Sequence, residues 1–117
     1  MTPDGLEELK LTLRRFTAER GWDKFHSPKN LTLSLMIEAA EIAEHFQWSD
    51  PPDASALPPE KREEIALEIA DTLIYLVELA DLLQVDMLAA AQRKMAINAV
   101  RYPVDKVYGR AVKYTEL

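Results

Sequence analysis

Residues 59–83 read PEKREEIALEIADTLIYLVELADLL, and this stretch decides the fold. It has no glycine and no proline after its first position, and it is rich in Leu, Ala, Glu and Ile, so it predicts one long helix. At about 100° per residue its apolar side chains fall on every side of that helix. They are Ile65, Ile69, Leu73, Ile74, Leu76, Val77, Leu79, Leu82 and Leu83. We therefore expect a central helix that is buried on most sides, partly by a second subunit, because four short-linked helices cannot easily wrap one of their own number.

Two helices are predicted before the central one. Each begins with a hydroxyl residue that can cap a helix, followed by a proline suited to the first helical position. These pairs are Thr2–Pro3 and Ser27–Pro28. We expect the first helix to end at Gly21 and the second to run to about Trp48.

A linker and a fourth helix are predicted on either side of the central helix. Residues 49–59 are rich in proline and predict a linker. Asp86 can cap a helix that ends before Tyr102–Pro103, and residues 102–117 are expected to be mostly irregular. We therefore expect an all-α fold, a four-to-five-helix bundle completed by oligomerisation, with residues 1–117 as a single domain.

The composition limits the classes of function. Fourteen Lys and Arg against twenty Asp and Glu give a net charge of −6, which argues against a nucleic-acid-binding surface. The lack of cysteine excludes disulfides, thiolate zinc sites and thiol nucleophiles. No apolar run is long enough for a membrane span, and the acidic N-terminus is unlike a signal peptide. We expect a cytoplasmic protein without nucleic-acid or membrane partners.

Two pairs of acidic residues stand out on the second and third predicted helices. Glu38 and Glu41 form one pair and Glu68 and Asp71 the other, and the i, i+3 spacing puts each pair on one helical face. Their neighbours on the helical wheel are core-like. Because buried carboxylates are costly and repel one another, four of them need positive charge nearby.

Divalent cations are one source of that charge. Carboxylate oxygens without thiols or clustered histidines suit Mg²⁺ or Mn²⁺, and two such ions balance four acids in a two-metal layout. A di-iron bundle is disfavoured because it needs two Glu-x-x-His motifs, whereas His45 directly follows Glu44. The alternative is that these acids lie on the surface or pair with Arg and Lys.

The fourth predicted helix carries basic and amide side chains, in contrast to the acidic pairs of the second and third helices. Lys94, Asn98 and Arg101 stand at i, i+4 and i+7, so one face presents an ammonium, an amide and a guanidinium. These groups suit phosphate oxygens. Alone they are also typical of a solvated basic face or of ion-pair partners, but beside a metal cluster they favour phosphate binding.

Several rings fall at predicted helix ends or in loops. Trp22 and Trp48 stand where an indole can stack on a base or fill a core. We expect Phe25 to lie in the core, and His26 to be a loop residue that hydrogen-bonds the backbone.

The combined motifs resemble those of the MazG-like all-α nucleoside triphosphate pyrophosphohydrolases, in particular the single-domain dCTP pyrophosphatase branch. The matching motifs are Glu38-x-x-Glu41, Glu68-x-x-Asp71, Lys94-x-x-x-Asn98-x-x-Arg101-Tyr102-Pro103, residues 21–30, Phe46-Gln47-Trp48 and Lys113-Tyr114-Thr115. The resemblance to this branch implies dCTP or a related triphosphate as the substrate. Leu13 and Ala99 depart from its pattern, because cytosine-preferring relatives carry a histidine and a basic residue at these positions, so the base preference stays open.

The resemblance implies that the protein cleans the nucleotide pool by hydrolysing nucleoside triphosphates to monophosphate and pyrophosphate. It implies that catalysis uses Mg²⁺, with Mn²⁺ as a substitute, held by Glu38, Glu41, Glu68 and Asp71. It also implies a homo-oligomer, a tetramer in preference to a dimer. The substrate would be bound by Trp22, Trp48, Tyr75, Lys94, Asn98 and Arg101. The competing hypothesis is a non-catalytic helical oligomerisation or adaptor module, in which the acids are structural.

Overall fold

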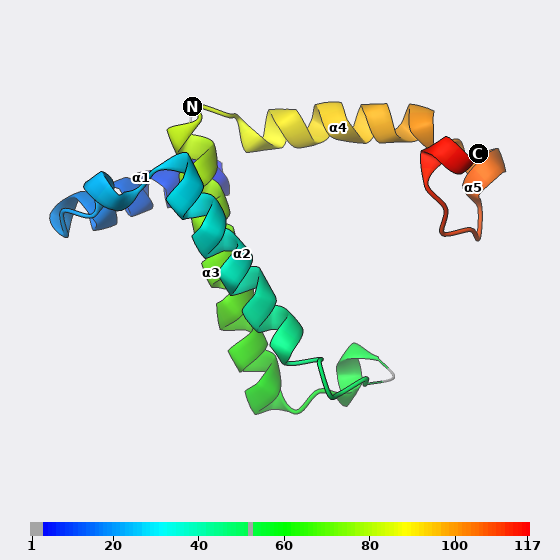
Figure 1. Ribbon diagram of the computed structural model, residues 1–117, viewed down its shortest axis with the longest axis horizontal. Coiled ribbons are helices and arrows are strands. Elements are labelled where there is room, and N and C mark those ends of the chain that lie inside the picture. The colour runs from blue at the N-terminus through cyan, green and yellow to red at the C-terminus, as the bar shows by residue number, and fades with distance from the viewer. Residues whose placement is uncertain (1–3, 52) are drawn as a thin grey trace. The chain divides into compact units, whose positions relative to one another are not determined.

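The computed structural model describes residues 4–51 and 53–117 (Figure 1). Within these ranges the chain forms five α-helices and no strand, which confirms the all-α prediction. The chain divides into two compact units, the first ending at Gln84 and the second running from Val85 to Leu117. Each unit is described below by itself.

Helix α1, Gly5–Glu19, opens the first unit. Asp4 caps it, because the Glu7 amide donates a hydrogen bond of 2.8 Å to Asp4 Oδ1. Our prediction of a start two residues earlier is wrong; Thr2 and Pro3 themselves lie outside the described residues. Gly21 follows the helix with a φ of 64°, a left-handed conformation that favours glycine and ends the helix as predicted.

Helix α2, Pro28–Glu44, has the predicted start and an earlier end than predicted. Ser27 Oγ accepts a hydrogen bond of 3.1 Å from the Asn30 amide, and Pro28 takes the first helical position. At the other end the amides of His45 and Phe46 bond to carbonyls three residues back, which tightens the last turn and stops the helix before Trp48.

Helix α3, Pro59–Leu82, is the central element of the first unit, as predicted. Helices α2 and α3 pack side by side, and α1 packs against α3 (Figure 1). The linker before α3 contains a short 3₁₀ turn, Ala54–Ala56, in which Asp53 accepts a hydrogen bond from the Ser55 amide.

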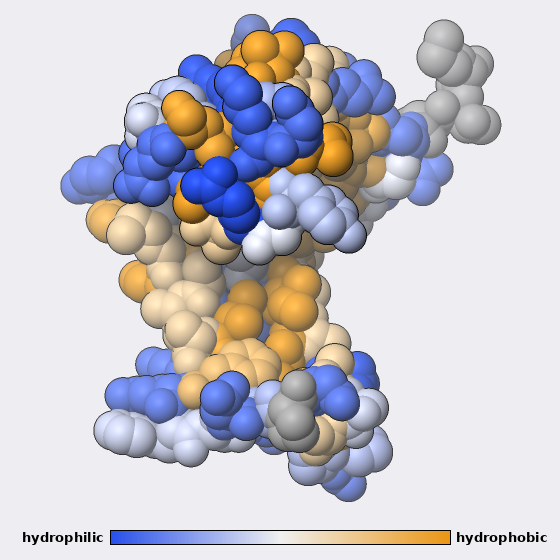
Figure 2. Space-filling model, turned by 90° about the vertical axis from the view of Figure 1, so that its right-hand side faces the viewer, coloured by the Kyte–Doolittle hydropathy of each residue, from blue (hydrophilic) through white to orange (hydrophobic). Residues whose placement is uncertain are grey.

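The core that these three helices enclose is small. Among the described residues of the first unit, the buried apolar side chains are Leu13, Leu31, Ile65 and Val77. Many large apolar side chains stay exposed on α2 and α3, and Figure 2 shows apolar side chains gathered over this helical pair. The most exposed are Leu33 at 50%, Met36 at 62%, Ile37 at 59%, Leu67 at 59% and Ile69 at 53%.

The second unit consists of α4, Met87–Arg101, and the chain that follows it. Asp86 caps α4 as predicted, accepting a hydrogen bond of 3.0 Å from the Ala89 amide. The tail is more ordered than expected, since it contains the short helix α5, Val104–Val107, and a 3₁₀ turn, Tyr114–Glu116. The Tyr114 ring packs edge-on against Tyr102, with centroids 6.0 Å apart. None of the helices in the described part of the chain is long and apolar enough to cross a membrane.

Candidate functional site

The four acids singled out from the sequence lie on the two helices that pack side by side. Glu38 and Glu41 belong to α2, and Glu68 and Asp71 belong to α3. Glu38, Glu41 and Glu68 are half-buried and Asp71 is exposed. The packing of α2 along α3 therefore brings the two i, i+3 pairs into one region of the first unit.

Electrostatics show that the four acids interact. The pKa of Glu38 is raised, first by burial, next by a side-chain hydrogen bond with Glu41, and then by the negative charges of Glu41, Asp71 and Glu68. The charges of the other three acids thus all act on the carboxyl group of Glu38.

Two enclosed carboxylate oxygens in this region accept no hydrogen bond from the described residues. Glu38 Oε2 and Glu68 Oε2 are enclosed, and neither has a hydrogen-bond partner among the described residues. As the side chains stand, no three His, Cys, Asp or Glu residues of the described ranges are gathered closely enough to hold a metal ion. The acids are thus within electrostatic range of one another without forming a closed ligand cage. Enclosed carboxylate oxygens that accept no hydrogen bond, with no thiol beside them, fit a hard divalent cation such as Mg²⁺ or Mn²⁺.

His45 is a site residue that sequence reasoning set aside. Its Nε2 lies 2.5 Å from Glu68 Oε2, although the two groups are not aligned as a hydrogen bond, and the His45 side chain is only 11% exposed. A signal was present in the sequence, because His45 follows Glu38 and Glu41 at i+7 and i+4 and so shares their helical face. His45 does not complete a di-iron motif, but its contact with Glu68 still places it at the acids.

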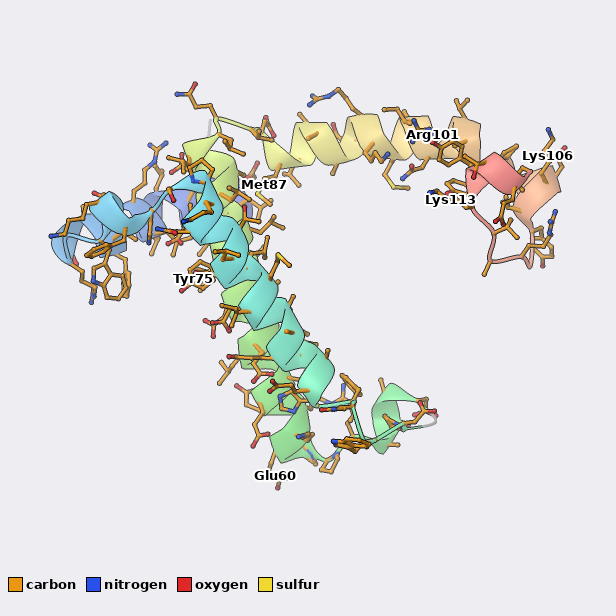
Figure 3. The ribbon with its side chains drawn as sticks, in the orientation of Figure 1. Glu60, Tyr75, Met87, Arg101, Lys106 and Lys113 are labelled. Carbon is orange, nitrogen blue, oxygen red and sulfur yellow. The ribbon has the colours of Figure 1, made fainter. Side chains whose placement is uncertain are left out.

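Tyr75 extends the site along α3, four residues after Asp71 (Figure 3). Burial raises the pKa of its hydroxyl, and the charges of Glu38, Glu78 and Asp71 raise it further. A side-chain hydrogen bond with Ser34 of α2 acts in the opposite direction. The tyrosine predicted to contact substrate therefore lies in the electrostatic field of the acids.

The two tryptophans have different surroundings. Trp22 packs edge-on against Phe16, with ring centroids 5.7 Å apart, and remains 44% exposed. Trp48 is 90% exposed and so fills no core of the first unit. Phe25, which we expected in the core, is 58% exposed because it lies in a 3₁₀ turn, Asp23–Phe25, outside the helical pair. Both indoles are available to stack on a planar group.

The predicted phosphate-binding residues all lie on α4, in the second unit. Lys94 and Arg101 are exposed and Asn98 is half-buried. The Arg101 guanidinium lies over the Tyr114 ring, 4.5 Å from its centroid, in a cation–π contact. The i, i+4, i+7 spacing on one helix is confirmed, whereas the meeting of this face with the acids stays a prediction.

Comparison with known proteins assigns the chain to a family. A family model described as the MazG-like family matches residues 33–117, which include all four acids and the three residues of α4. The chain belongs to the MazG-like family. The resemblance noted from the motifs is thereby confirmed.

Individual relatives of this MazG-like chain are pyrophosphatases. dCTP pyrophosphatase 1 of Mus musculus is 45% identical over 114 residues, which cover 96% of this chain and 67% of the mouse protein. dCTP pyrophosphatase 1 of Homo sapiens is 42% identical over 114 residues, again 96% of this chain and 67% of the relative. The crystal structure of a pyrophosphatase from Archaeoglobus fulgidus DSM 4304 has a TM-score of 0.79 at 42% identity, and the match covers 88% of this chain and 96% of that one.

Proposed function

We propose that this MazG-like chain hydrolyses dCTP or a related nucleoside triphosphate to the monophosphate and pyrophosphate, and that Mg²⁺ bound by Glu38, Glu41, Glu68 and Asp71 supports the reaction. The observation that carries the proposal is the gathering of the acids of α2 and α3 around Glu38, whose enclosed Oε2 has no hydrogen-bond partner among the described residues. The relatives support it, because those named above are dCTP pyrophosphatases and a pyrophosphatase.

The overall reaction adds one water and breaks the bond between the α-phosphorus and the oxygen that bridges to the β-phosphate. A bound divalent cation supplies an acidified water and neutralises phosphate charge. The four carboxylates hold and orient that cation, with Mn²⁺ as a substitute for Mg²⁺. Burial and the neighbouring acids raise the pKa of Glu38 in the metal-free site, and a bound divalent cation would offset that repulsion.

The other predicted residues bind the substrate. Trp22 and Trp48 present exposed indole rings on which a base can stack. The hydroxyl of Tyr75 lies beside the acids, where it can donate a hydrogen bond to a sugar or phosphate oxygen. The binding of the phosphate oxygens is assigned to Lys94, Asn98 and Arg101 on α4.

We also propose that the active form is a homo-oligomer, a tetramer in preference to a dimer. Support comes from the small core of the first unit and from the exposed apolar side chains of α2 and α3, such as Met36 and Ile37. A helical pair with this much exposed apolar surface is stabilised when a second copy covers it. Such an enzyme would remove surplus or non-canonical triphosphates from the cytoplasmic nucleotide pool.

The proposal is tested by pyrophosphate release from a panel of deoxynucleoside triphosphates with Mg²⁺. We expect release from dCTP or a close relative, and a loss of at least about 100-fold in Glu68→Gln and in Asp71→Ala, as for other residues that bind a catalytic metal. Glu64→Gln is the matched control, because its side chain on the same helix is 64% exposed. Absence of pyrophosphate from every triphosphate would favour the adaptor hypothesis.

A further inference from the structure

His45 is the basic side chain that lies at the acids of the first unit. Its Nε2 is 2.5 Å from Oε2 of Glu68, and the two side chains are only 11% and 25% exposed. The lysine and arginine ion pairs in the described part of this unit involve other acids, namely Glu7, Glu19, Glu64 and Asp81. Within residues 4–51 and 53–84, His45 is therefore the one basic side chain within ion-pair distance of the four acids.

The contact indicates where the imidazole carries its hydrogen. An N···O distance of 2.5 Å is too short for two lone pairs that face each other, so a hydrogen lies between the two atoms. Nδ1 of His45 is enclosed and has no hydrogen-bond partner among the described residues. A hydrogen on Nδ1 alone would leave an enclosed donor without an acceptor, and a lone pair of Nε2 against a carboxylate. The tautomer with its hydrogen on Nε2 avoids both costs, so His45 is a donor toward Glu68.

The two groups are at hydrogen-bonding distance but are not aligned as a hydrogen bond. Alignment requires a change of angle and no closer approach, and the broad χ2 torsion of histidine allows the ring to turn at little cost. The resulting bond occupies Oε2 of Glu68 and leaves the second oxygen of that carboxylate for a divalent cation. Carboxylates that bind metals are usually hydrogen-bonded in this way, and the partner strengthens metal binding.

We propose that His45 is a positioning residue, which holds one oxygen of the Glu68 carboxylate so that the other is ordered for a divalent cation. This inference rests on the proposed function and adds a residue outside the four acids. His45 follows Glu41 by four residues and so shares its helical face, whereas Glu68 belongs to α3, the helix that packs against α2. The contact therefore joins the end of α2 to α3 at the acids.

The experiment measures the dissociation constant of Mn²⁺ by electron paramagnetic resonance, without substrate, in the wild type and two variants. His45→Leu removes the donor and should weaken Mn²⁺ binding by about 10- to 100-fold, as for other groups that orient a metal ligand. His45→Gln should stay within about threefold of the wild type, because its amide nitrogen reaches a similar position and also donates. Circular dichroism verifies that each variant is folded.

Two further readouts distinguish positioning from other roles. Pyrophosphate release by His45→Leu should be impaired at limiting Mn²⁺ and recover when Mn²⁺ exceeds the raised dissociation constant, which a purely structural defect would not do. Electron spin-echo modulation of Mn²⁺ bound to the wild type should show no directly bound nitrogen. A directly bound nitrogen would overturn the positioning role, whether or not the leucine variant folds, because the imidazole would then be a ligand.

The control and the remaining outcomes separate the two proposals. His26→Leu replaces the other histidine of the chain, in the turn before α2, and should keep the wild-type dissociation constant. Unchanged Mn²⁺ binding in folded His45→Leu, or a loss in His45→Gln as large as in His45→Leu, would overturn the role of His45 and leave the proposed function intact. A wild type that neither binds Mn²⁺ nor releases pyrophosphate would overturn the proposed function, and the role of His45 with it.

Discussion

Replacing Glu38 by glutamine should stabilise the metal-free protein while impairing metal binding. Glu38 is the acid on which burial and the charges of Glu41, Asp71 and Glu68 converge. A like-charge pair at the surface of helices costs roughly 0.2–0.5 kcal/mol, so three such neighbours together cost about 1 kcal/mol. Removing that repulsion should raise Tm by about 4 °C for a chain of this length.

Thermal unfolding, followed by circular dichroism with EDTA and with Mg²⁺, measures both effects. In the wild type, Mg²⁺ at ten times its dissociation constant should add about 1.4 kcal/mol of stability, because the ion binds the native state. Glu38→Gln should gain much less from the same concentration, since one ligand charge is lost. Glu64→Gln, an exposed change on α3, should follow the wild type in both conditions.

The pH dependence of the stability difference between Glu38→Gln and the wild type is a further test, because the reasoning fixes its direction. Because the pKa of Glu38 is raised in the folded protein, its contribution to stability is fully present below the unfolded pKa and is lost as pH rises through the folded pKa. The advantage of Glu38→Gln in EDTA should therefore be largest near neutral pH and shrink in acid. An equal response to Mg²⁺ in the two proteins, or a lower Tm of the variant in EDTA at neutral pH, would refute the reasoning.

Three further changes test the packing. Leu31→Ala removes a side chain that is 2% exposed and should cost about 2–4 kcal/mol in a urea titration; a loss below about 1 kcal/mol would contradict its place in the core. Asp81→Asn should lower the urea midpoint slightly, because Arg14 holds the pKa of Asp81 below its ordinary value of 3.8. The difference between the two proteins should be present above that pH and disappear as pH falls through the lowered pKa. A difference that grows in acid would contradict this reasoning. Ile37→Glu should shift the species seen by analytical ultracentrifugation to a smaller mass, whereas a wild type that sediments as a single chain would refute oligomerisation.

Local signals made most helix starts predictable. Ser27 with Pro28, and Asp86, act through hydrogen bonds to amides three residues away, so the sequence alone contains all that determines them. The end of α2 could not be predicted in this way. No glycine or proline interrupts the residues from Glu44 to Trp48, and the helix ends by tightening its last turn.

The site was predictable where one helical face decides it and not where tertiary packing does. The i, i+3 spacing is enough to identify Glu38 with Glu41 and Glu68 with Asp71 as two pairs. The approach of His45 to Glu68 depends on how α2 lies along α3, which spacing within either helix does not specify. The same holds for the enclosure of the Glu78 carboxylate, because its surroundings come from separate helices.

The claim on which the account depends is that carboxylates from α2 and α3 together bind divalent cations. Anomalous diffraction from crystals soaked in Mn²⁺ tests it directly, because the ion is located against its ligands. We expect anomalous peaks at coordination distance from oxygens of Glu38, Glu41, Glu68 and Asp71. Crystals in which these four groups point apart and no peak lies among them, at Mn²⁺ concentrations that support pyrophosphate release, would contradict the account.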